Sequence, residues 1–445
     1  MLVLKKLNNY LLLLVVFLLP LQTRYIWRAG MLNNGPFEYG TIALYGLDLL
    51  ILLALLIGLV IDFFANKENF KNRKYWIAIL AMGIVACLSL FEASDKRLVL
   101  YGLGKLAVSV GLFWLIYTNS LTSKKIMATF LLAVALQGAF AGWQFNQQTT
   151  PANKWLGLAQ HTSTDLGASV VETTAKDGHS ERWLRAYGSF DHPNMLGGFL
   201  ALGLLMAIWL LINTPVGQKQ KTKEMFLSLA IILGVTGLFL SFSRAAVLAF
   251  GVGLTILFIS QLKLWPRLIL SAFLVVIVSA TLSYQYGYLY ASRAKNIAVS
   301  DIDKRLEAKS ISERIEYLNQ AKTLIKTHPL LGVGLGNFGI TVSKKITLKQ
   351  ISYYYQPVHN VFYLVASEIG LLGLACLLLL FGLLIMASLK INSINCLPLA
   401  MIAGLITIMM LDHWLWSLHF GVIFFWVILG LSFKIILENK KVVLN

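Results

Sequence analysis

Apolar stretches of about twenty residues recur along most of the chain, and they limit its fold more than any other feature. Each is long enough to cross a hydrocarbon core of about 30 Å as a helix. Only 13% of the 445 residues are charged, against roughly 25% in soluble proteins. Backbone groups in lipid must pair within a helix or a closed barrel, and the short alternating strands of a barrel are not seen. We therefore predict an all-α, polytopic transmembrane helix bundle in which residues 1–445 form a single integral membrane domain.

The hydropathy pattern predicts about twelve spans. They are Tyr10–Leu21, Thr41–Phe64, Trp76–Phe91, Leu98–Tyr117, Met127–Trp143, Met195–Ile212, Phe226–Leu240, Ala245–Ser260, Leu268–Leu282, Phe362–Ala387, Cys396–Leu411 and Phe420–Leu437. Two long connections remain, a first loop at residues 144–194 and a second loop at residues 284–360. Loops of this length in a helix bundle usually carry function.

The cations of the short loops are distributed unequally between the two sides of the membrane. If the N-terminus is cytoplasmic, the short inner loops hold seventeen lysines and arginines and the short outer loops hold five. This positive-inside pattern predicts that both termini are cytoplasmic and that both long loops lie outside. The net charge of +18 then reflects topology, with an anionic ligand accounting for part of it, and we expect no nucleic-acid partner.

The second loop is predicted to contain an amphipathic helix at residues 311–327. Ser310 and Glu313 fit a capping box, and Ile311, Ile315, Leu318 and Ile325 fall near one helical face. Pro329 ends the helix, and four glycines follow it: Gly332, Gly334, Gly336 and Gly339. Such a helix could lie on the membrane surface or cap the bundle.

Charged residues near the spans are candidates for function because they are costly in lipid. Arg244 is the one charged residue between Met225 and Leu262 and lies in the tight turn SFSRAA. It either snorkels to the interface or binds a phosphate through its planar fork. Asp412 begins the outer turn DHWLW. The turn is either an ordinary tryptophan-rich membrane interface or part of the site, in which case the Asp412 carboxylate orients a histidine or an arginine.

His359 lies where the second loop enters a span. Its near-neutral pKa suits a general base, although a lone histidine at a helix start is more often a cap or an interface residue. Tyr363 shares its helical face, whereas Glu368, nine residues on, faces roughly the opposite way. The sequence therefore makes Glu368 a poor direct partner for His359.

Further candidates come from the end of the first loop and from the amphipathic helix. The segment RWLRAYGSFDHPNMLGGFL contains Arg182 and Arg185, followed by a span with Gly197 and Gly198, which allow close helix approach. Arg314, on the amphipathic helix, is most often a solvated arginine, and Lys105, inside a span, either snorkels or lines a cavity. Under the predicted topology five candidates share the outer face: Arg185, Arg244, Arg314, His359 and Asp412.

Several other chemistries are disfavoured by the sequence. No zinc-type His/Glu spacing and no phosphate-binding glycine motif of a nucleotide fold is present, so we expect no metal and no cofactor. The three cysteines lie in apolar runs and are interpreted as small core side chains: Cys87, Cys376 and Cys396.

Five stretches, in this order and spacing, resemble the O-antigen ligase and polymerase family of membrane glycosyltransferases. They are RAYGSFDHPNMLGGFLALG, SFSRAAVLAFGVG, ERIEYLNQAKTLIKTHPLLGVGLGNF, HNVFYLVASEIGLLGL and DHWLW…FFWVILGL. The resemblance covers about Arg185 to Leu431, and the N-terminal part agrees in hydropathy and in LPLQTR only.

The resemblance implies a metal-independent enzyme of the bacterial inner membrane that moves an oligosaccharide from undecaprenyl diphosphate to an acceptor. His359 would be the base and Asp412 would orient it, while Arg244, Arg314 and Arg185 would hold the diphosphate; Arg182 competes with Arg185 for that role. The acceptor would be a growing glycan, as in a polymerase, or lipid A-core, as in a ligase. The alternatives are a protein O-oligosaccharyltransferase, disfavoured by the short C-terminal region, and a transporter of bicarbonate or lipid-linked glycan.

Overall fold

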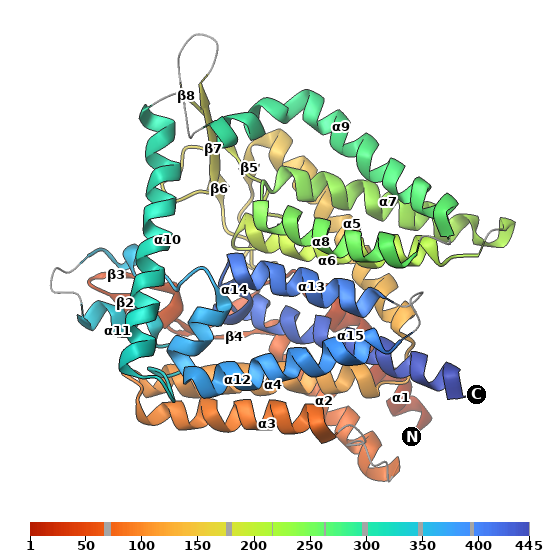
Figure 1. The fold of residues 1–445 in the computed structure, drawn as a ribbon, viewed down its shortest axis with the longest axis horizontal. Helices are drawn as coiled ribbons and strands as arrows, with labels where there is room; N and C mark the ends of the chain where they lie inside the picture. The colour runs from red at the N-terminus through yellow and green to blue at the C-terminus, as the bar shows by residue number, and fades with distance from the viewer. Residues whose placement is uncertain are drawn as a thin grey trace.

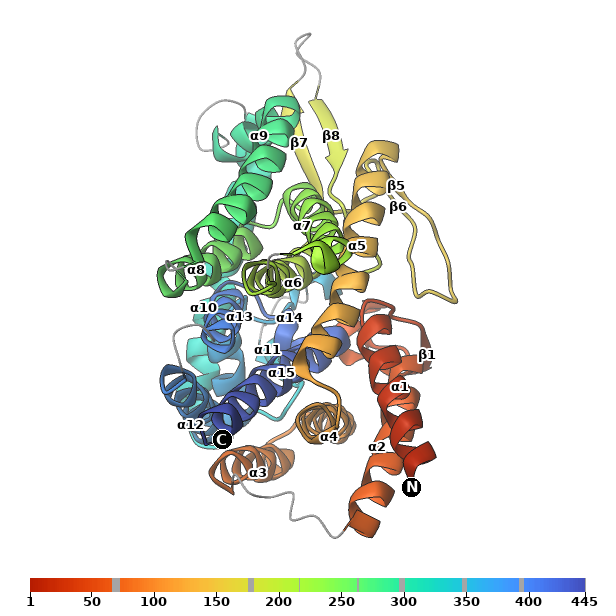
Figure 2. The same cartoon turned by 90° about the vertical axis from the view of Figure 1, so that its right-hand side faces the viewer.

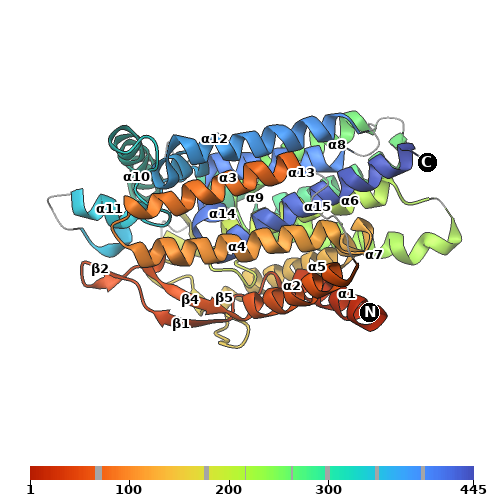
Figure 3. The same cartoon turned by 90° about the horizontal axis from the view of Figure 1, so that it is seen from below.

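In the computed structural model the helices run side by side along the long axis of the molecule (Figures 1 and 3). The structure describes residues 1–65, 73–174, 180–215, 217–261, 264–295, 301–345, 350–391 and 396–444. Both chain termini lie at one end of the bundle, and the long connections lie at the other, hereafter the loop end (Figure 1). Short stretches of both predicted loops fall outside the described residues: 175–179, 296–300 and 346–349.

The prediction of an all-α polytopic bundle is confirmed. Nine helices of the described chain are long and apolar enough to cross a membrane, and two shorter apolar helices accompany them. Length and composition therefore do not decide whether the number of spans is the predicted twelve. The long helices are α2 (Gly46–Ala65), α3 (Arg73–Leu88), α4 (Lys96–Thr118), α5 (Ser123–Gln147), α6 (Pro193–Ile212), α7 (Lys221–Leu240), α9 (Trp265–Lys295), α12 (Val361–Leu389) and α15 (His419–Leu444). The two short ones are α8 (Arg244–Ser260) and α13 (Leu397–Leu411), and α1 (Leu2–Leu18) opens the chain.

Helix α6 forms the centre of the bundle. It is apolar on every side, and a helix of this kind is stable only when neighbours cover it all round. In the structure its whole length from Pro193 to Ile212 is buried, apart from the amide of Asn194, which is half-buried. Figure 2 shows α5, α7, α8 and α13 around it. The start of α6 therefore reaches the loop end from the middle of the bundle.

The loop end is built from short strands and from helices that lie outside the bundle. The strands pair as four antiparallel two-stranded ribbons: β1 (Arg24–Arg28) with β4 (Ile42–Tyr45), β2 (Met31–Leu32) with β3 (Gly35–Pro36), β5 (Thr149–Thr150) with β6 (His161–Thr162), and β7 (Val170–Thr174) with β8 (Ser180–Leu184). The remaining helices at this end are α10 (Asp301–Thr327), α11 (Phe338–Lys345) and α14 (Trp414–Ser417).

Helix α9 continues beyond residue 284, where the second loop was predicted to begin. Its polar last turns are held by contacts that hydropathy does not report. The hydroxyl of Tyr290 donates to the carbonyl of Phe239 at 2.6 Å, and Ser292 bonds to Thr173 of β7 at 2.9 Å. The connection to α12 therefore starts after Lys295.

Helix α10 contains the helix predicted at 311–327 but begins earlier, at Asp301, so Ser310 lies within it rather than at its cap. The intervening residues IDKRLEAK are mostly good helix formers, which explains the extension. Its buried face carries Tyr317, Ala321 and Leu324, whereas the predicted apolar residues Ile311 and Ile315 stay exposed. The helix crosses the loop end nearly at right angles to the bundle (Figure 1), which agrees with the capping alternative.

A kink in α12 ties the second loop to the bundle. Ile369 and Gly370 leave helical geometry, and Gly370 has φ +72, which favours glycine. The freed backbone pairs with the chain that follows α10: Val333 N–H donates to the Ser367 carbonyl and Gly334 N–H to the Glu368 carbonyl, both at 2.9 Å. A Cβ on Gly370 would lie 1.9 Å from the Leu330 carbonyl oxygen, so the two segments meet only because it is glycine.

Candidate active site

Three ionisable residues from two elements meet at the loop end: His359, Asp412 and His413, hereafter the histidine–aspartate cluster. Their ligand-type side-chain atoms all lie within 4.8 Å of one another. His359 precedes α12, and the other two form the turn between α13 and α14. The rings of His359 and His413 meet edge to face at 4.8 Å between centroids. Two candidates predicted from separate motifs, His359 and Asp412, are thus brought together.

His359 is not a helix cap. The cap of α12 is Asn360, whose Oδ1 accepts from the backbone N–H groups of Phe362 and Tyr363 at 3.0 and 3.2 Å. The imidazole of His359 is partly exposed, although its Nδ1 is buried. The exposed part of a neutral imidazole can meet a substrate hydroxyl and take its proton.

Asp412 is fixed by two hydrogen bonds. Its Oδ1 accepts from the backbone N–H of His413 at 2.8 Å, and its Oδ2 accepts from Nδ2 of Asn194 at 2.7 Å. Asn194 in turn accepts at Oδ1 from the guanidinium of Arg185 at 2.7 Å, and Nε of Arg185 donates to the Ser241 carbonyl at 2.8 Å. A continuous chain of hydrogen bonds therefore runs from Arg185 through Asn194 to Asp412.

The two glycines at the start of α6 make this chain possible. A Cβ on Gly197 would lie 2.8 Å from the side chains of Ser243 and Ala246, and a Cβ on Gly198 would lie 2.6 Å from the Trp414 ring. Helix α6 is therefore wedged between the α7–α8 turn and the α14 turn, in agreement with the close approach predicted from these glycines. Asn194, one turn earlier, is placed between Arg185 and Asp412.

Arg185 and Arg182 have different surroundings. Arg185 is buried, with 7% of its surface exposed. Arg182 lies in the β7–β8 hairpin and pairs with Glu172 of the opposite strand at 3.1 Å. Of these two arginines, Arg185 is the one connected to the histidine–aspartate cluster.

Arg244 is the first residue of α8 and is exposed. It follows the turn at Phe242, whose φ is +49, and Ser243 caps the helix through a bond from Ala246 N–H. Helices α8 and α13 pack closely, since a Cβ on Gly404 would lie 3.3 Å from the Ala249 carbonyl oxygen. That register places Arg244 beside the last turn of α13, the helix that ends at Asp412.

Helix α10 supplies Tyr317 and Arg314 to the cluster. The ring of Tyr317 stacks parallel to that of His359, with 5.9 Å between centroids and 9° between planes. Arg314 lies three residues earlier and is exposed, and its charge acts on both histidines of the cluster. Tyr317 gave no distinctive signal in the sequence, because a tyrosine on an amphipathic helix is an ordinary core residue.

Burial and neighbouring charges set the protonation of the cluster. Burial, opposed by the carboxylate of Asp412, holds the pKa of His359 below its ordinary value. Burial also lowers the pKa of His413 to about 3, so its ring is neutral at pH 7. Burial opposes ionisation of Asp412, but the nearby histidines and the bond from Asn194 hold its pKa below the ordinary value. At neutral pH the cluster therefore has two neutral imidazoles and one carboxylate.

In the part of the chain that the structure describes, the histidine–aspartate cluster is also the one group close enough to hold a metal ion. Nδ1 of His413 is already bonded to the hydroxyl of Ser417 at 2.7 Å. A metal ion would therefore bind to Nε2 of His413, to the ring of His359 and to the carboxylate of Asp412, which Asn194 already binds. The sequence could not indicate this group, because its histidines lie on different elements without metal-ligand spacing.

Glu368 and Lys105 lie away from His359, around a polar chamber inside the loop end. The chamber leaves about 80 Å³ of space that the centres of water molecules can occupy, and its polar lining includes Glu38, Tyr45, Lys105, Asp191, Glu368 and Trp416. Glu368 accepts from the indole N–H of Trp416 at 2.9 Å, so its partner is Trp416. The prediction that Glu368 turns away from His359 agrees with this placement.

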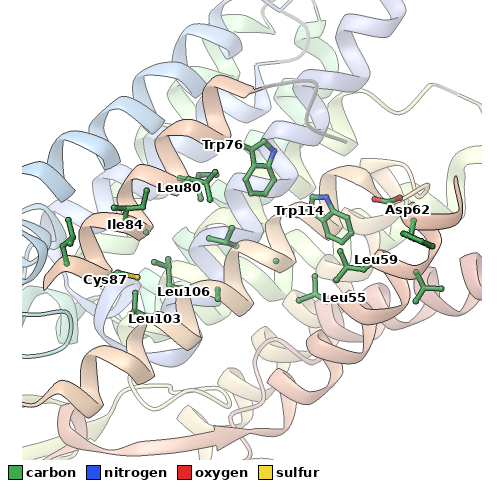
Figure 4. A pocket seen from close by; sticks show the side chains of 18 of the residues that line it. Leu55, Leu59, Asp62, Trp76, Leu80, Ile84, Cys87, Leu103, Leu106 and Trp114 are labelled. Atoms are coloured by element: carbon green, nitrogen blue, oxygen red, sulfur yellow. The ribbon is translucent and has the colours of Figure 1, made fainter. Parts of the chain in front are cut away.

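An apolar groove runs along the bundle on the other side of α4. It is lined by residues of α2 between Leu55 and Phe64, of α3 between Trp76 and Leu88, and of α4 between Leu103 and Trp114. Figure 4 shows side chains from the three helices around this space, among them Leu59, Ile84 and Leu103. Leu106 of α4 lines both the groove and the polar chamber, so the two spaces lie on either side of α4 at this residue.

Comparison with known protein families gives one match. Residues 229–378, about a third of the chain, match the family model described as O-Antigen ligase. The match spans Arg244, Arg314 and His359 and ends before Asp412. No curated protein matches the chain at a significant level. The chain is therefore a multi-pass membrane protein in which residues 229–378 match the O-antigen ligase family.

Proposed function

We propose that the protein is a membrane glycosyltransferase that moves an oligosaccharide from undecaprenyl diphosphate to a hydroxyl of a second glycan or of lipid A-core. The observation that carries the proposal is the geometry of His359, whose ring is partly exposed and lies against Asp412 and His413. The family match supports a lipid-linked glycan as donor. The reaction takes place at the loop end, which the charge pattern puts on the outer face of the inner membrane.

His359 acts as the general base. Its neutral ring takes the proton of the acceptor hydroxyl while the hydroxyl oxygen attacks the anomeric carbon of the donor sugar. The bond between that carbon and the diphosphate oxygen breaks, and undecaprenyl diphosphate leaves with the electron pair. The carboxylate of Asp412 stabilises the imidazolium that forms on His359.

Two exposed arginines hold the leaving diphosphate. Arg244 at the start of α8 and Arg314 on α10 approach the cluster from two sides, and each can bind phosphate oxygens through two parallel N–H bonds. Positive groups placed in advance stabilise the charge that develops as the diphosphate leaves. Arg185 has the distinct role of positioning, because its donors already bind Ser241 and Asn194.

The apolar groove provides a surface for a lipid tail. It is lined mainly by leucine, isoleucine, valine and aromatic side chains of three membrane-crossing helices, with Asp62 of α2 at its edge among the few polar groups (Figure 4). A polyprenyl or acyl chain could lie along it while the polar end of the same lipid reaches the loop end.

Glycan transfer with the purified protein tests this function. The protein in detergent is supplied with undecaprenyl diphosphate-linked oligosaccharide and, separately, with lipid A-core, a further donor molecule and a pilin-like protein, each with and without a chelator. Transfer to one acceptor establishes the enzyme and identifies it as ligase, polymerase or protein transferase. Loss of transfer with the chelator would assign a metal to the histidine–aspartate cluster. No transfer to any acceptor, together with flux in proteoliposomes, would replace the enzyme with a transporter.

A further inference from the structure

The polar chamber contains two opposite charges that the protein does not neutralise. Lys105 projects from α4 about 14 Å below the start of that helix, and Asp191 precedes α6. Among the described residues neither has a hydrogen bond or an ion pair: the ammonium of Lys105 only lies over the Tyr101 ring, at 4.7 Å. An unpaired ammonium at membrane depth is costly, so the chamber must supply water or a ligand to it.

The other charged groups of the chamber are already satisfied. Glu38 pairs with Arg24, and the Asp48 carboxylate next to the chamber binds His419 at 2.8 Å. Glu368 accepts from Trp416 and from backbone N–H groups. Two groups remain for a ligand: the ammonium of Lys105, which donates, and the carboxylate of Asp191, which accepts. Because their charges are opposite, they suit a molecule without net charge better than an anion or a cation.

Aromatic rings form much of the rest of the lining. Tyr39, Tyr45, Tyr101 and Trp416 all border the chamber. Tyr45 is stacked flat on His419, with 3.4 Å between centroids. Aromatic faces pack against the C–H face of a sugar ring, while sugar hydroxyls both accept from an ammonium and donate to a carboxylate. The combination matches a pyranose better than a lipid tail or a free phosphate.

The position of the chamber indicates which glycan it would hold. None of the three candidate arginines lines it, so a diphosphate held by them lies outside. Two residues of its wall contact the histidine–aspartate cluster: Ser417 bonds to Nδ1 of His413 at 2.7 Å, and Tyr39 meets the His413 ring edge to face at 5.6 Å. Pro357, two residues before His359, also lines it. A sugar in the chamber therefore lies next to the cluster, in a space that none of these arginines lines.

We propose that the polar chamber is the acceptor-sugar site, and that Lys105 and Asp191 bind hydroxyls of one neutral pyranose of the acceptor glycan. This inference rests on the proposed glycosyltransferase function. The neighbouring groove fits the assignment, because an acceptor carried on a lipid could place its tail in the groove and its sugar across α4 in the chamber.

Binding of free glycan tests the chamber separately from catalysis. The probe is the oligosaccharide released by mild acid from the polyprenyl-linked glycans of the host, titrated into the detergent-solubilised protein by calorimetry. Lys105→Met and Asp191→Asn should each weaken binding by about tenfold or more, because each removes a charged hydrogen-bond partner. In transfer assays the same variants should raise the acceptor KM by a similar factor, with kcat and the donor KM little changed.

Lys96→Met is the matched control, because Lys96 begins α4 but lies outside the chamber. Its binding and acceptor KM should equal those of the wild type. Melting temperature is measured for every variant, and Lys105→Met should not lower it, since an unpaired buried charge is removed. Asp191→Asn, at the chamber mouth, gives an independent measurement if Lys105→Met fails to fold.

The outcomes separate the two proposals. Glycan binding that depends on Lys105 and Asp191 without any transfer would support the chamber and overturn the transferase. Transfer with unchanged acceptor KM and unchanged binding in both variants would overturn the chamber and leave the transferase intact. A rise in donor KM instead of acceptor KM would overturn the acceptor assignment, because the chamber would then hold the donor sugar.

Discussion

The histidine–aspartate cluster and the polar chamber both bring ionisable groups together, but the protein pairs these groups to different degrees. In the cluster, both oxygens of Asp412 are bonded and a chain of contacts leads back to Arg185. In the chamber, Lys105 and Asp191 face open space. Groups that the protein itself binds are held in one geometry, whereas groups it leaves unbound are available to a ligand. Within the cluster His359 is the member whose side chain is partly exposed, whereas Asp412 and His413 are buried.

The largest expected effect is that of His359→Ala. Loss of the base should reduce transfer by about 10² to 10⁴. The variant should still fold, because the ring loses only local contacts with Tyr317 and His413. The measurement is initial rate with donor and acceptor saturating. His328→Ala is the control, since His328 pairs with Glu92 at 3.3 Å at the end of α10 and should retain activity. Full transfer by the His359 variant would remove the base assignment.

Arg185→Lys distinguishes a positioning arginine from a diphosphate ligand. A lysine cannot reach both the Ser241 carbonyl and Asn194, so we expect a loss of about 2 to 3 kcal/mol in unfolding free energy, measured by denaturation in detergent. Arg182→Lys, in the hairpin ion pair with Glu172, should change it by less than about 1 kcal/mol. An Arg185 variant of normal stability but weakened donor affinity would assign Arg185 to the diphosphate.

Asp412→Asn should move the pH dependence of transfer. Because the base must be neutral, kcat/KM of the wild type should rise with pH through the pKa of His359, which burial holds below its usual value of 6.5. The carboxylate of Asp412 raises that pKa, so its removal should shift the acid limb to lower pH. The value of kcat/KM at high pH should also fall, by about tenfold, because the imidazolium of His359 loses its charged partner. A limb that stays in place or moves to higher pH would contradict the role of Asp412.

The smallest expected effect is that of Arg244→Lys. Lysine retains the charge but loses the planar fork, so the donor KM should rise by about tenfold with normal stability. Arg28→Lys, at the exposed ion pair with Asp95 at the loop end, should leave the donor KM unchanged. Identical kinetics for the Arg244 variant and the wild type would favour the snorkelling alternative.

Individual elements show where prediction from sequence succeeded and where it could not. The apolar run of α6 and its glycines predicted a closely packed helix, because hydropathy and side-chain size are local properties. The length of α9 was underestimated, because its polar last turns are held by Tyr290 and Ser292 through contacts with other elements. The sequence did not indicate which face of α10 is buried against the protein, and the structure shows that this face carries Tyr317, whereas Ile311 and Ile315 are exposed.

The sequence by itself determined that this chain is a polytopic helical membrane protein, because a low charge density and repeated apolar runs leave no other way to satisfy the backbone. Its motifs also indicated the O-antigen ligase resemblance, which the match at residues 229–378 supports, and pointed to His359, Asp412 and the arginines as candidates. Only the tertiary structure decided that His359 meets Asp412 and His413, that Arg185 is tied to Asn194, and that Lys105 and Asp191 share a chamber. Those pairings join residues far apart in the chain. Gly197 and Gly198 indicate close packing locally, but which elements pack against them is decided only by the tertiary fold.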